Sequence, residues 1–145
     1  MSRLRILADP IDPAQVEASV RGAAHGATAC FTGIVRELAD DGRSVSGLSY
    51  EAHAEMAVAE FERIAAEAIQ YFGTCEIAVA HRVGNLAVGD VAVAVAVGAV
   101  HRSTALDACR YAIDQLKARA PIWKREMYAD GSSAWRDNCP PDRQA

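Results

Sequence analysis

The segment that most limits the possible folds is a run of ten residues, VAVAVAVGAV at 91–100, that contains no polar side chain. A strand with one face toward water alternates apolar and polar residues, whereas a strand buried on both faces reads as a continuous apolar run. A run of this length is also far too short to cross a bilayer as a helix. The segment therefore predicts a central β-strand covered on both faces by its own chain, or on one face by a partner chain.

Two long helices are predicted, one before this strand in the sequence and one after it. The first covers residues 53–72 and ends at Gly73, and its apolar face comprises Met56, Ala59 or Phe61, Ile64, Ala68 and Phe72. The second begins near Thr104, whose spacing to Asp107 approximates a capping box, and it ends at Pro121, which cannot continue a helix. Its buried stripe is predicted to be Leu106, Cys109, Ile113 and Leu116.

The remaining elements complete a mixed fold. A short helix is expected from Asp12 to Gly22, and strands are expected at 3–7, 27–37, 45–51 and 75–84. Residues 84–90 are predicted to be a turn-rich link. This order favours an α+β fold in which the helices pack on a mainly antiparallel sheet. We expect a single domain over residues 1–145, with a flexible tail at 136–145.

Composition and charge exclude several classes of function. The net charge of −4 argues against binding to nucleic acid through a broad positive surface. The absence of a long apolar run argues against a membrane protein, and the N-terminal residues do not read as a secretion signal, so a cytoplasmic protein is expected. The four cysteines are scattered without a C-x-x-C pair, which predicts free thiols and no metal site.

A cluster of positive charge stands out in this acidic chain. The stretch KARAPIWKRE at 117–126 holds two lysines and two arginines around Pro121 and Trp123. Cations suit the end of a helix, and those beyond the proline suit an exposed strand, so a solvated surface explains part of the pattern. A site that handles anions is the other interpretation, and the stretch alone leaves both open.

Two further segments could supply cations or a wall to such a site. His101 and Arg102 lie where the apolar strand gives way to a helix, whose first backbone N–H groups attract phosphate or carboxylate, although Arg102 could equally be solvated. In CFTGIVRE at 30–37, Phe31 could line a pocket or pack in the core, and Arg36 offers another cation. His81 is interpreted as structural, with the lining of a site as a second possibility.

Taken together, several segments carry a family resemblance. These are FTGIVR at 31–36, AHRVG at 80–84 with the following Gly-Asp, the block from 99 to 126, and Trp135. They resemble the large, catalytic subunit of molybdopterin synthase from roughly Cys30 to Trp135. The resemblance implies an α/β-hammerhead type of fold and a sulfurtransferase that converts cyclic pyranopterin monophosphate (precursor Z) to molybdopterin. It implies no cofactor and no metal.

The resemblance also implies partners. The sulfur is delivered as a thiocarboxylate on the C-terminal glycine of a small ubiquitin-like carrier subunit. Two copies of the large subunit form a homodimer, and one carrier docks on each copy to make a heterotetramer. Whether a basic residue of the tail, Arg136 or Arg143, crosses the dimer into the partner's site is left open.

Residue roles follow from the same resemblance. Lys117 and Lys124 match the catalytic lysines: Lys117 is assigned to the thiocarboxylate and acyl chemistry, and Lys124 to electrostatics or proton transfer. The residues matched to substrate binding are Ile34, Val35, Arg36, His101, Arg102, Lys117, Lys124, Arg125 and Glu126. Ile34 stands where a relative can carry a cation. With isoleucine at this position, the anion pocket would have one positive charge fewer.

Two alternatives compete with this interpretation. A non-catalytic module that binds a phosphorylated metabolite would use Arg36, His101 and Arg102 and leave both lysines idle. A structural dimerisation subunit would be supported only by the apolar strand at 91–100. The pair of lysines around a helix-ending proline favours the enzyme.

Overall fold

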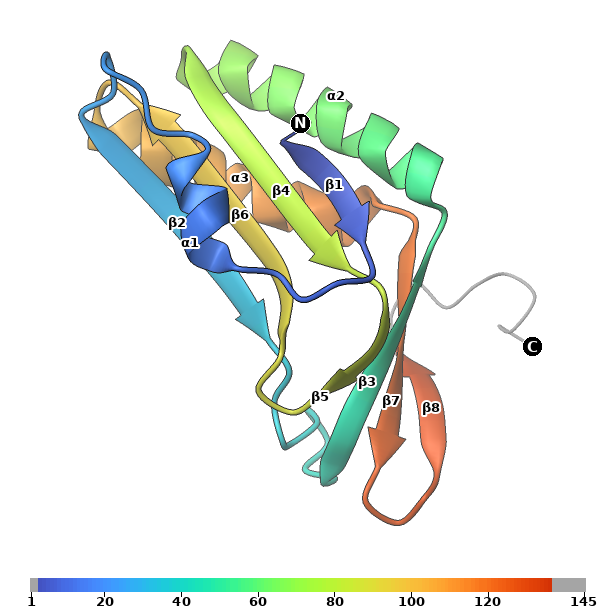
Figure 1. Cartoon of the computed structure of the whole chain (residues 1–145). Coiled ribbons are helices and arrows are strands. Elements are labelled where there is room, and N and C mark those ends of the chain that lie inside the picture. The colour runs from blue at the N-terminus through green and yellow to red at the C-terminus, as the bar shows by residue number, and fades with distance from the viewer. Residues whose placement is uncertain (1–2, 137–145) are drawn as a thin grey trace.

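The computed structural model describes residues 3–136, and these form two four-stranded sheets and three helices (Figure 1). The elements are β1 (Leu4–Leu7), α1 (Pro13–Ala18), β2 (Ala27–Ile34), β3 (Val45–Ala52), α2 (Ala54–Phe72), β4 (Cys75–Arg82), β5 (Gly84–Ala87), β6 (Val91–Ala99), α3 (Arg102–Arg119), β7 (Ile122–Tyr128) and β8 (Ser133–Arg136). The prediction of an α+β fold with mainly antiparallel strands is confirmed. Of the helices in the described part of the chain, none combines the length and apolar content needed to cross a bilayer.

The first sheet has the strand order β1-β4-β6-β2, and only the β1–β4 pair is parallel. Figure 1 shows α1 over one face of this sheet and α2 and α3 over the other. The predicted edge strand at 3–7 is β1, and the apolar run is the inner strand β6. The short helix α1 is capped by Asp12 as predicted, but it ends at Ala18, before the expected Gly22.

The alternation of valine and alanine along β6 matches the two layers that cover it. Val93, Val95 and Val97 pack in the larger core with α2 and α3. Ala94 and Ala96 face the opposite way and pack beneath α1. Large side chains therefore fill the space below two long helices, and small ones let a short helix approach closely. The strand is covered on both faces by its own chain, so it no longer supports a purely structural dimerisation subunit.

Gly98 continues the close approach beneath α1. A Cβ atom at this position would lie 2.0 Å from the backbone oxygen of Val20, at the end of the α1 segment. Val20 is fully buried, and its carbonyl oxygen also accepts a hydrogen bond of 2.8 Å from Nδ1 of His25. The absence of a side chain at position 98 is therefore a packing requirement.

Both long helices form where the sequence predicts them, but two apolar residues point outward. The buried set of α2 is Ala57, Phe61, Ile64 and Ala68, whereas the predicted Met56 is 55% exposed. In α3, Leu106 is 58% exposed because the face against the sheet is built from neighbouring alanines together with Cys109, Ile113 and Leu116. In both helices the residue next to the true stripe was mistaken for part of it.

The start of α3 also differs from the prediction. Thr104 does not form a capping box: its hydroxyl donates a hydrogen bond of 3.0 Å to the carbonyl oxygen of Phe72. His101 occupies the N-cap position without a capping hydrogen bond from its side chain. Thr104 therefore ties the start of α3 to the end of α2.

The second sheet has the order β5-β3-β7-β8, and of its strands only β3 is among those expected from the sequence, while β7 occupies the segment for which an exposed strand was left open. The expected turn-rich link at 84–90 includes β5, which pairs with β3. Arg136, expected to begin a flexible tail, is the last residue of β8. The rest of that tail, including Arg143, lies outside the described residues. Because β7 follows α3 directly, the end of this helix lies where the two sheets meet.

Candidate functional site

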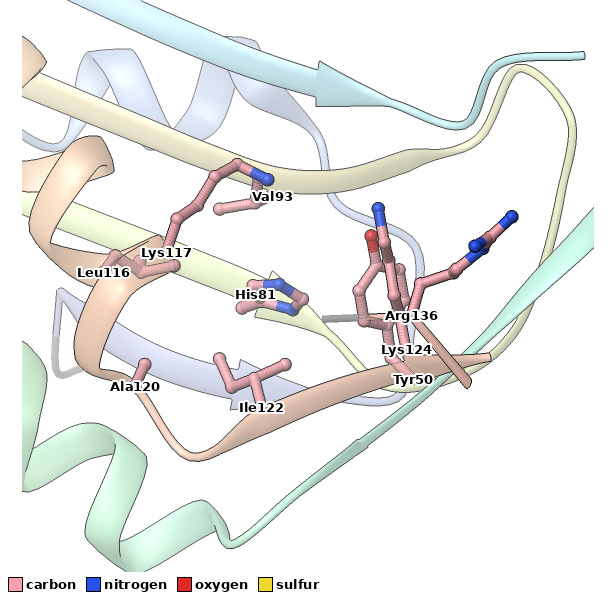
Figure 2. A pocket seen from close by; sticks show the side chains of 9 residues that line it. All are labelled: Tyr50, His81, Val93, Leu116, Lys117, Ala120, Ile122, Lys124 and Arg136. Atoms are coloured by element: carbon pink, nitrogen blue, oxygen red, sulfur yellow. The ribbon is translucent and has the colours of Figure 1, made fainter. Parts of the chain in front are cut away.

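A cavity of about 90 Å³ lies at the junction of the two sheets, beside the end of α3 (Figure 2). Its polar lining comes from five elements: Tyr50 of β3, His81 of β4, Lys117 of α3, Lys124 of β7 and Arg136 of β8. A larger cavity of about 300 Å³ adjoins it and shares Tyr50, Lys117 and Lys124. Because the two cavities share lining residues, we treat them as one site, and both sheets contribute side chains to it.

The two lysines reach this site because the chain reverses between them. α3 ends at Arg119, and Pro121 then leads into β7. Along β7 alternate residues share a face, so Lys124 and Glu126 point to the cavities and Arg125 points away. Lys124 also lies directly opposite Tyr50 in the pairing of β7 with β3. Lys117 and Lys124 are the only lysines in the chain, and both line the same two cavities.

The other two cations of the 117–126 stretch have different positions. Arg119 bridges to α2, where its guanidinium lies 2.6 Å from carboxylate oxygens of both Glu60 and Glu67. Arg125 lies on the far face of β7, with its guanidinium carbon 5.7 Å from the ring centre of Trp135. The stretch thus divides into two lysines at the cavity and two arginines that pack elsewhere.

His81 lies in the smaller cavity and is almost fully buried, with 5% of its surface exposed. Its Nδ1 atom is 2.9 Å from the carbonyl oxygen of Arg82, and its ring meets that of Tyr50 edge-on with centroids 4.9 Å apart. Burial, helped by the charge of Lys117 and opposed by the hydrogen bond to Arg82, lowers the pKa of His81 to about 4. The imidazole is therefore neutral at neutral pH.

The surroundings of Tyr50 also favour the neutral form of its side chain. Burial of its phenol, together with the nearby carboxylate of Glu126, raises the pKa of Tyr50 above its ordinary value. At neutral pH the smaller cavity therefore presents a neutral imidazole and a neutral phenol among three cationic side chains.

Two arginines at the rim are paired with acidic residues of the loop that follows β2. Arg36 lines the larger cavity and lies 2.7 Å from Asp40, whose pKa it lowers. Arg136 donates to Glu126 at 2.7 Å and to Asp41 at 2.6 Å. A third cavity of about 150 Å³ lies among Lys124, Arg136 and these acidic residues. The rim is therefore a network of ion pairs next to the lysines.

The structure brings together most of the predicted site residues. Those that line the cavities are Phe31, Ile34, Arg36, Lys117, Lys124 and Glu126. Val35 is 2% exposed and packs in the core of the second sheet, so its side chain supports the wall from behind. Arg125 faces away, and its Nε is enclosed without a hydrogen-bond partner in the described part of the chain.

His101 and Arg102 are not brought to these cavities within one chain. They lie at the start of α3, whereas Lys117 lies in its last turn, and fifteen residues of helix separate Arg102 from Lys117 by about 22 Å. Both His101 and Arg102 are exposed. Their predicted role therefore requires a ligand that reaches this end of the helix, or a second copy of the chain.

Three residues of the site were not predicted as such. Tyr50 was not singled out, His81 was interpreted as structural with the lining of a site as a second possibility, and Arg136 was placed in the tail with a role in the partner's site left open. His81 belongs to the AHRVG segment that contributed to the resemblance, and this was the available signal. Neither Tyr50 nor Arg136 has a local sequence signal, because each reaches the site through strand pairing.

The chemistry of the site suits an anion. Lysines and arginines in a partly enclosed cavity bind phosphate or carboxylate through charge-assisted hydrogen bonds and stabilise an oxyanion that develops during acyl transfer. No group of three or more histidine, cysteine or acidic side chains is placed to hold a metal ion within residues 3–136.

Comparisons with known proteins show the family to which this chain is similar. The family model described as "MoaE protein" matches residues 6–119. The chain is 42% identical over 127 residues to the molybdopterin synthase catalytic subunit of Nostoc sp., which covers 87% of this chain and 76% of that relative. It is 44% identical over 128 residues to the subunit of the same name from Oryza sativa subsp. indica, which covers 88% of this chain but 65% of the relative.

A solved structure extends the similarity to three dimensions. The crystal structure of molybdopterin synthase from Staphylococcus aureus matches with a TM-score of 0.88 and 34% sequence identity. The match covers 94% of this chain and 98% of the other. The similarity therefore includes both sheets and the helix that carries Lys117.

Proposed function

This chain belongs to the MoaE family, whose curated relatives are molybdopterin synthase catalytic subunits, and we propose that it inserts the two dithiolene sulfurs of molybdopterin into cyclic pyranopterin monophosphate. This is a step of molybdenum cofactor biosynthesis. The observation that carries the proposal is the convergence of both lysines of the chain on one enclosed site. A module that only binds a phosphorylated metabolite would not need them.

The sulfur comes from a partner in this proposal. A small ubiquitin-like carrier delivers it as a thiocarboxylate at its C-terminal glycine, and the word "subunit" in the names of the relatives fits a second component. The three thiols that the structure describes are poor candidates for a sulfur relay, because desolvation raises the pKa of the buried Cys75 and Cys109 and, together with the charge of Glu17, that of the exposed Cys30. A thiol with a raised pKa is rarely ionised at neutral pH and is a weak nucleophile.

The lysines divide the chemistry. Sulfur transfer develops negative charge on the acyl oxygen of the carrier, and Lys117 stabilises that oxyanion next to the neutral His81. Lys124, opposite Tyr50, binds the anionic substrate or moves a proton at the pterin. Glu126 lines the larger cavity beside them and sets the position of Arg136 through a hydrogen bond of 2.7 Å.

The phosphate of the substrate requires further cations. Arg36 at the rim of the larger cavity is the nearest candidate within the chain. We place His101 and Arg102 in the site of a second copy, because about 22 Å of helix separates them from Lys117 in their own chain. This arrangement needs the homodimer, and one carrier on each copy then makes a heterotetramer. We also place the assembly in the cytoplasm, where a reducing environment keeps cysteines as free thiols.

The test is direct conversion of the substrate. The purified chain is incubated with cyclic pyranopterin monophosphate and a thiocarboxylated carrier, and the pterin is followed by mass spectrometry. We expect a product in which two sulfurs have been gained, and no product with a carrier that ends in an ordinary carboxylate. A folded chain that binds the pterin but leaves its mass unchanged would establish a binding module instead.

A further inference from the structure

The smaller cavity has walls that can donate hydrogen bonds but are poor in acceptors. Lysine and arginine side chains only donate, so Lys117, Lys124 and Arg136 cannot recognise an N–H or O–H group of a ligand. A pterin ring system carries several such groups. An acceptor among these cations would therefore help to decide which heterocycle enters, and His81 is the imidazole in this lining.

The hydrogen bond to the backbone determines which nitrogen of His81 is the acceptor. The carbonyl oxygen of Arg82 can only accept, so the Nδ1 atom that lies 2.9 Å from it carries the proton. Burial and the charge of Lys117 keep the ring neutral, with a pKa of about 4. In this neutral tautomer Nε2 has a free lone pair.

Nε2 is also accessible from the cavity. Within residues 3–136 the only hydrogen bond of the His81 ring is the one made by Nδ1. In the same part of the chain, the only side-chain nitrogen or oxygen that is fully enclosed and lacks a partner is Nε of Arg125. Nε2 of His81 therefore has neither a protein partner nor complete enclosure, although the residue as a whole is 5% exposed.

The ring is held in a fixed orientation. The edge-on contact with Tyr50 restrains it on one side, and the hydrogen bond to Arg82 restrains it on another. Figure 2 shows His81 between Lys117 on one side and Tyr50 and Lys124 on the other. An acceptor that is oriented before the ligand arrives loses little entropy on binding and discriminates strongly between ligands.

We propose that His81 is a specificity-determining residue, and that its Nε2 atom accepts a hydrogen bond from an N–H or O–H group of a pterin-class substrate bound between Lys117 and Lys124. The inference rests on the proposed function for the identity of the substrate. It adds the acceptor that the cationic residues of the site lack.

Two substitutions separate the acceptor from the shape of the ring. His81→Phe keeps a ring against Tyr50 and removes the acceptor, whereas His81→Gln places an amide oxygen near the position of Nε2. We expect kcat/KM for cyclic pyranopterin monophosphate to fall roughly 10- to 100-fold in His81→Phe, and His81→Gln to recover most of this loss. A His81→Phe variant with the wild-type melting temperature and unchanged kcat/KM would overturn the inference.

A second measurement needs no turnover, and it uses a variant only to assign a signal. In protein with ¹⁵N-labelled histidine, Nδ1 of His81 should carry the proton in the free chain, and the Nε2 signal should move when the pterin is added without carrier. The chain has four histidines, and the signal missing from His81→Gln identifies His81. An Nε2 signal that stays unchanged at saturating pterin would refute the role of His81. A pterin that moves this signal but keeps its mass when the thiocarboxylated carrier is then added would instead count against the proposed sulfur transfer alone.

Discussion

The hydroxyl of Tyr128 donates a hydrogen bond of 2.9 Å to Oε1 of Glu126, two residues earlier on the same face of β7. Tyr128 is 3% exposed and Glu126 is 8% exposed, so this carboxylate has little water around it. Its stability as an anion depends on protein donors, and Arg136 supplies the second one at 2.7 Å. The wall of the site thus contains a nearly buried charge held by neighbours on two strands.

Tyr128→Phe removes one of these donors without changing the shape of the side chain. Because the lost hydrogen bond is to a charged group, we expect the free energy of unfolding to fall by about 1.5–3 kcal/mol, measured by urea denaturation. Tyr71→Phe is the matched control, since Tyr71 is 62% exposed and its change should lie within about 0.5 kcal/mol. Equal effects of the two substitutions would mean that Glu126 does not depend on Tyr128.

Lys117→Ala should abolish sulfur transfer and leave the fold intact. Lys117 is exposed and lies outside the buried set of α3, while its amine reaches the cavity, so we expect turnover to fall at least about 100-fold. Arg110→Ala on the same helix is the control, because the Arg110 side chain is 86% exposed. Turnover close to normal in a folded Lys117→Ala protein would remove Lys117 from the mechanism.

His81 should make the stability of the protein depend on pH. The folded protein lowers its pKa from 6.5 to about 4, so between these values the unfolded chain binds a proton that the folded chain does not. The free energy of unfolding therefore decreases as the pH falls through this interval. Each pH unit corresponds to about 1.4 kcal/mol, so the expected loss is roughly 2 kcal/mol at pH 5. Carboxylates titrate in the same range, so the comparison is with His81→Gln.

The difference between the two proteins isolates the imidazole. Urea denaturation at pH 7 and pH 5 should show a larger loss of stability in the wild type than in His81→Gln. The charged and titratable side chains that face the ring, namely Tyr50, Lys117, Lys124 and Arg136, are the same in both. Parallel losses in the two proteins would show that His81 is not held neutral by the fold.

Gly98→Ala tests the close approach of α1 to the sheet. The added Cβ would lie 2.0 Å from the backbone oxygen of Val20, so either the α1 segment or β6 must move. We expect a loss of about 1–3 kcal/mol or more in the free energy of unfolding. Gly22→Ala is the control, because its nearest neighbour would be a side-chain atom of His25 at 3.4 Å. A tolerated Gly98→Ala would mean that α1 is packed more loosely than its buried valines indicate.

The cysteines should be dispensable for the chemistry. Desolvation raises the pKa of the three described thiols, to about 11 for Cys109. A chain in which all four cysteines are replaced by serine should lose some packing stability and still transfer sulfur from the carrier. If that variant stays folded and binds the carrier but transfers nothing, the protein uses its own thiol as a relay.

The parts of the fold that the sequence predicted are those with long periodic patterns. β6, α2 and α3 each present enough repeated apolar positions to define a strand or a helix. The same patterns misplaced Met56 and Leu106, because periodicity does not distinguish a large apolar residue beside the stripe from a small one on it. β5 and β8 are too short to carry a pattern, and they form through pairing with distant strands.

The site shows the same limit. Lys117 and Lys124 lie in one local stretch, which raised the possibility of a site, and the family resemblance then assigned them to it; a single reversal at Pro121 brings them to the same cavities. His101 and Arg102 belong to the same block of sequence, yet an intervening helix places them far from the lysines. Tyr50 and Arg136 enter the cavity only through the pairing of β7 with its neighbours, which no local signal encodes.

The parallel pairing of β1 with β4 has a consequence for the timing of synthesis. Leu4 is paired with Val79, 75 residues later, and the alanines that α1 covers lie beside Val79 on β4 and farther along the chain on β6. At 5–20 residues per second, about 4–15 s pass between the synthesis of β1 and that of its partner. The helix α1 therefore leaves the ribosome before the strands that it covers, and the alanine face of β6 has no cover until α1 packs on it.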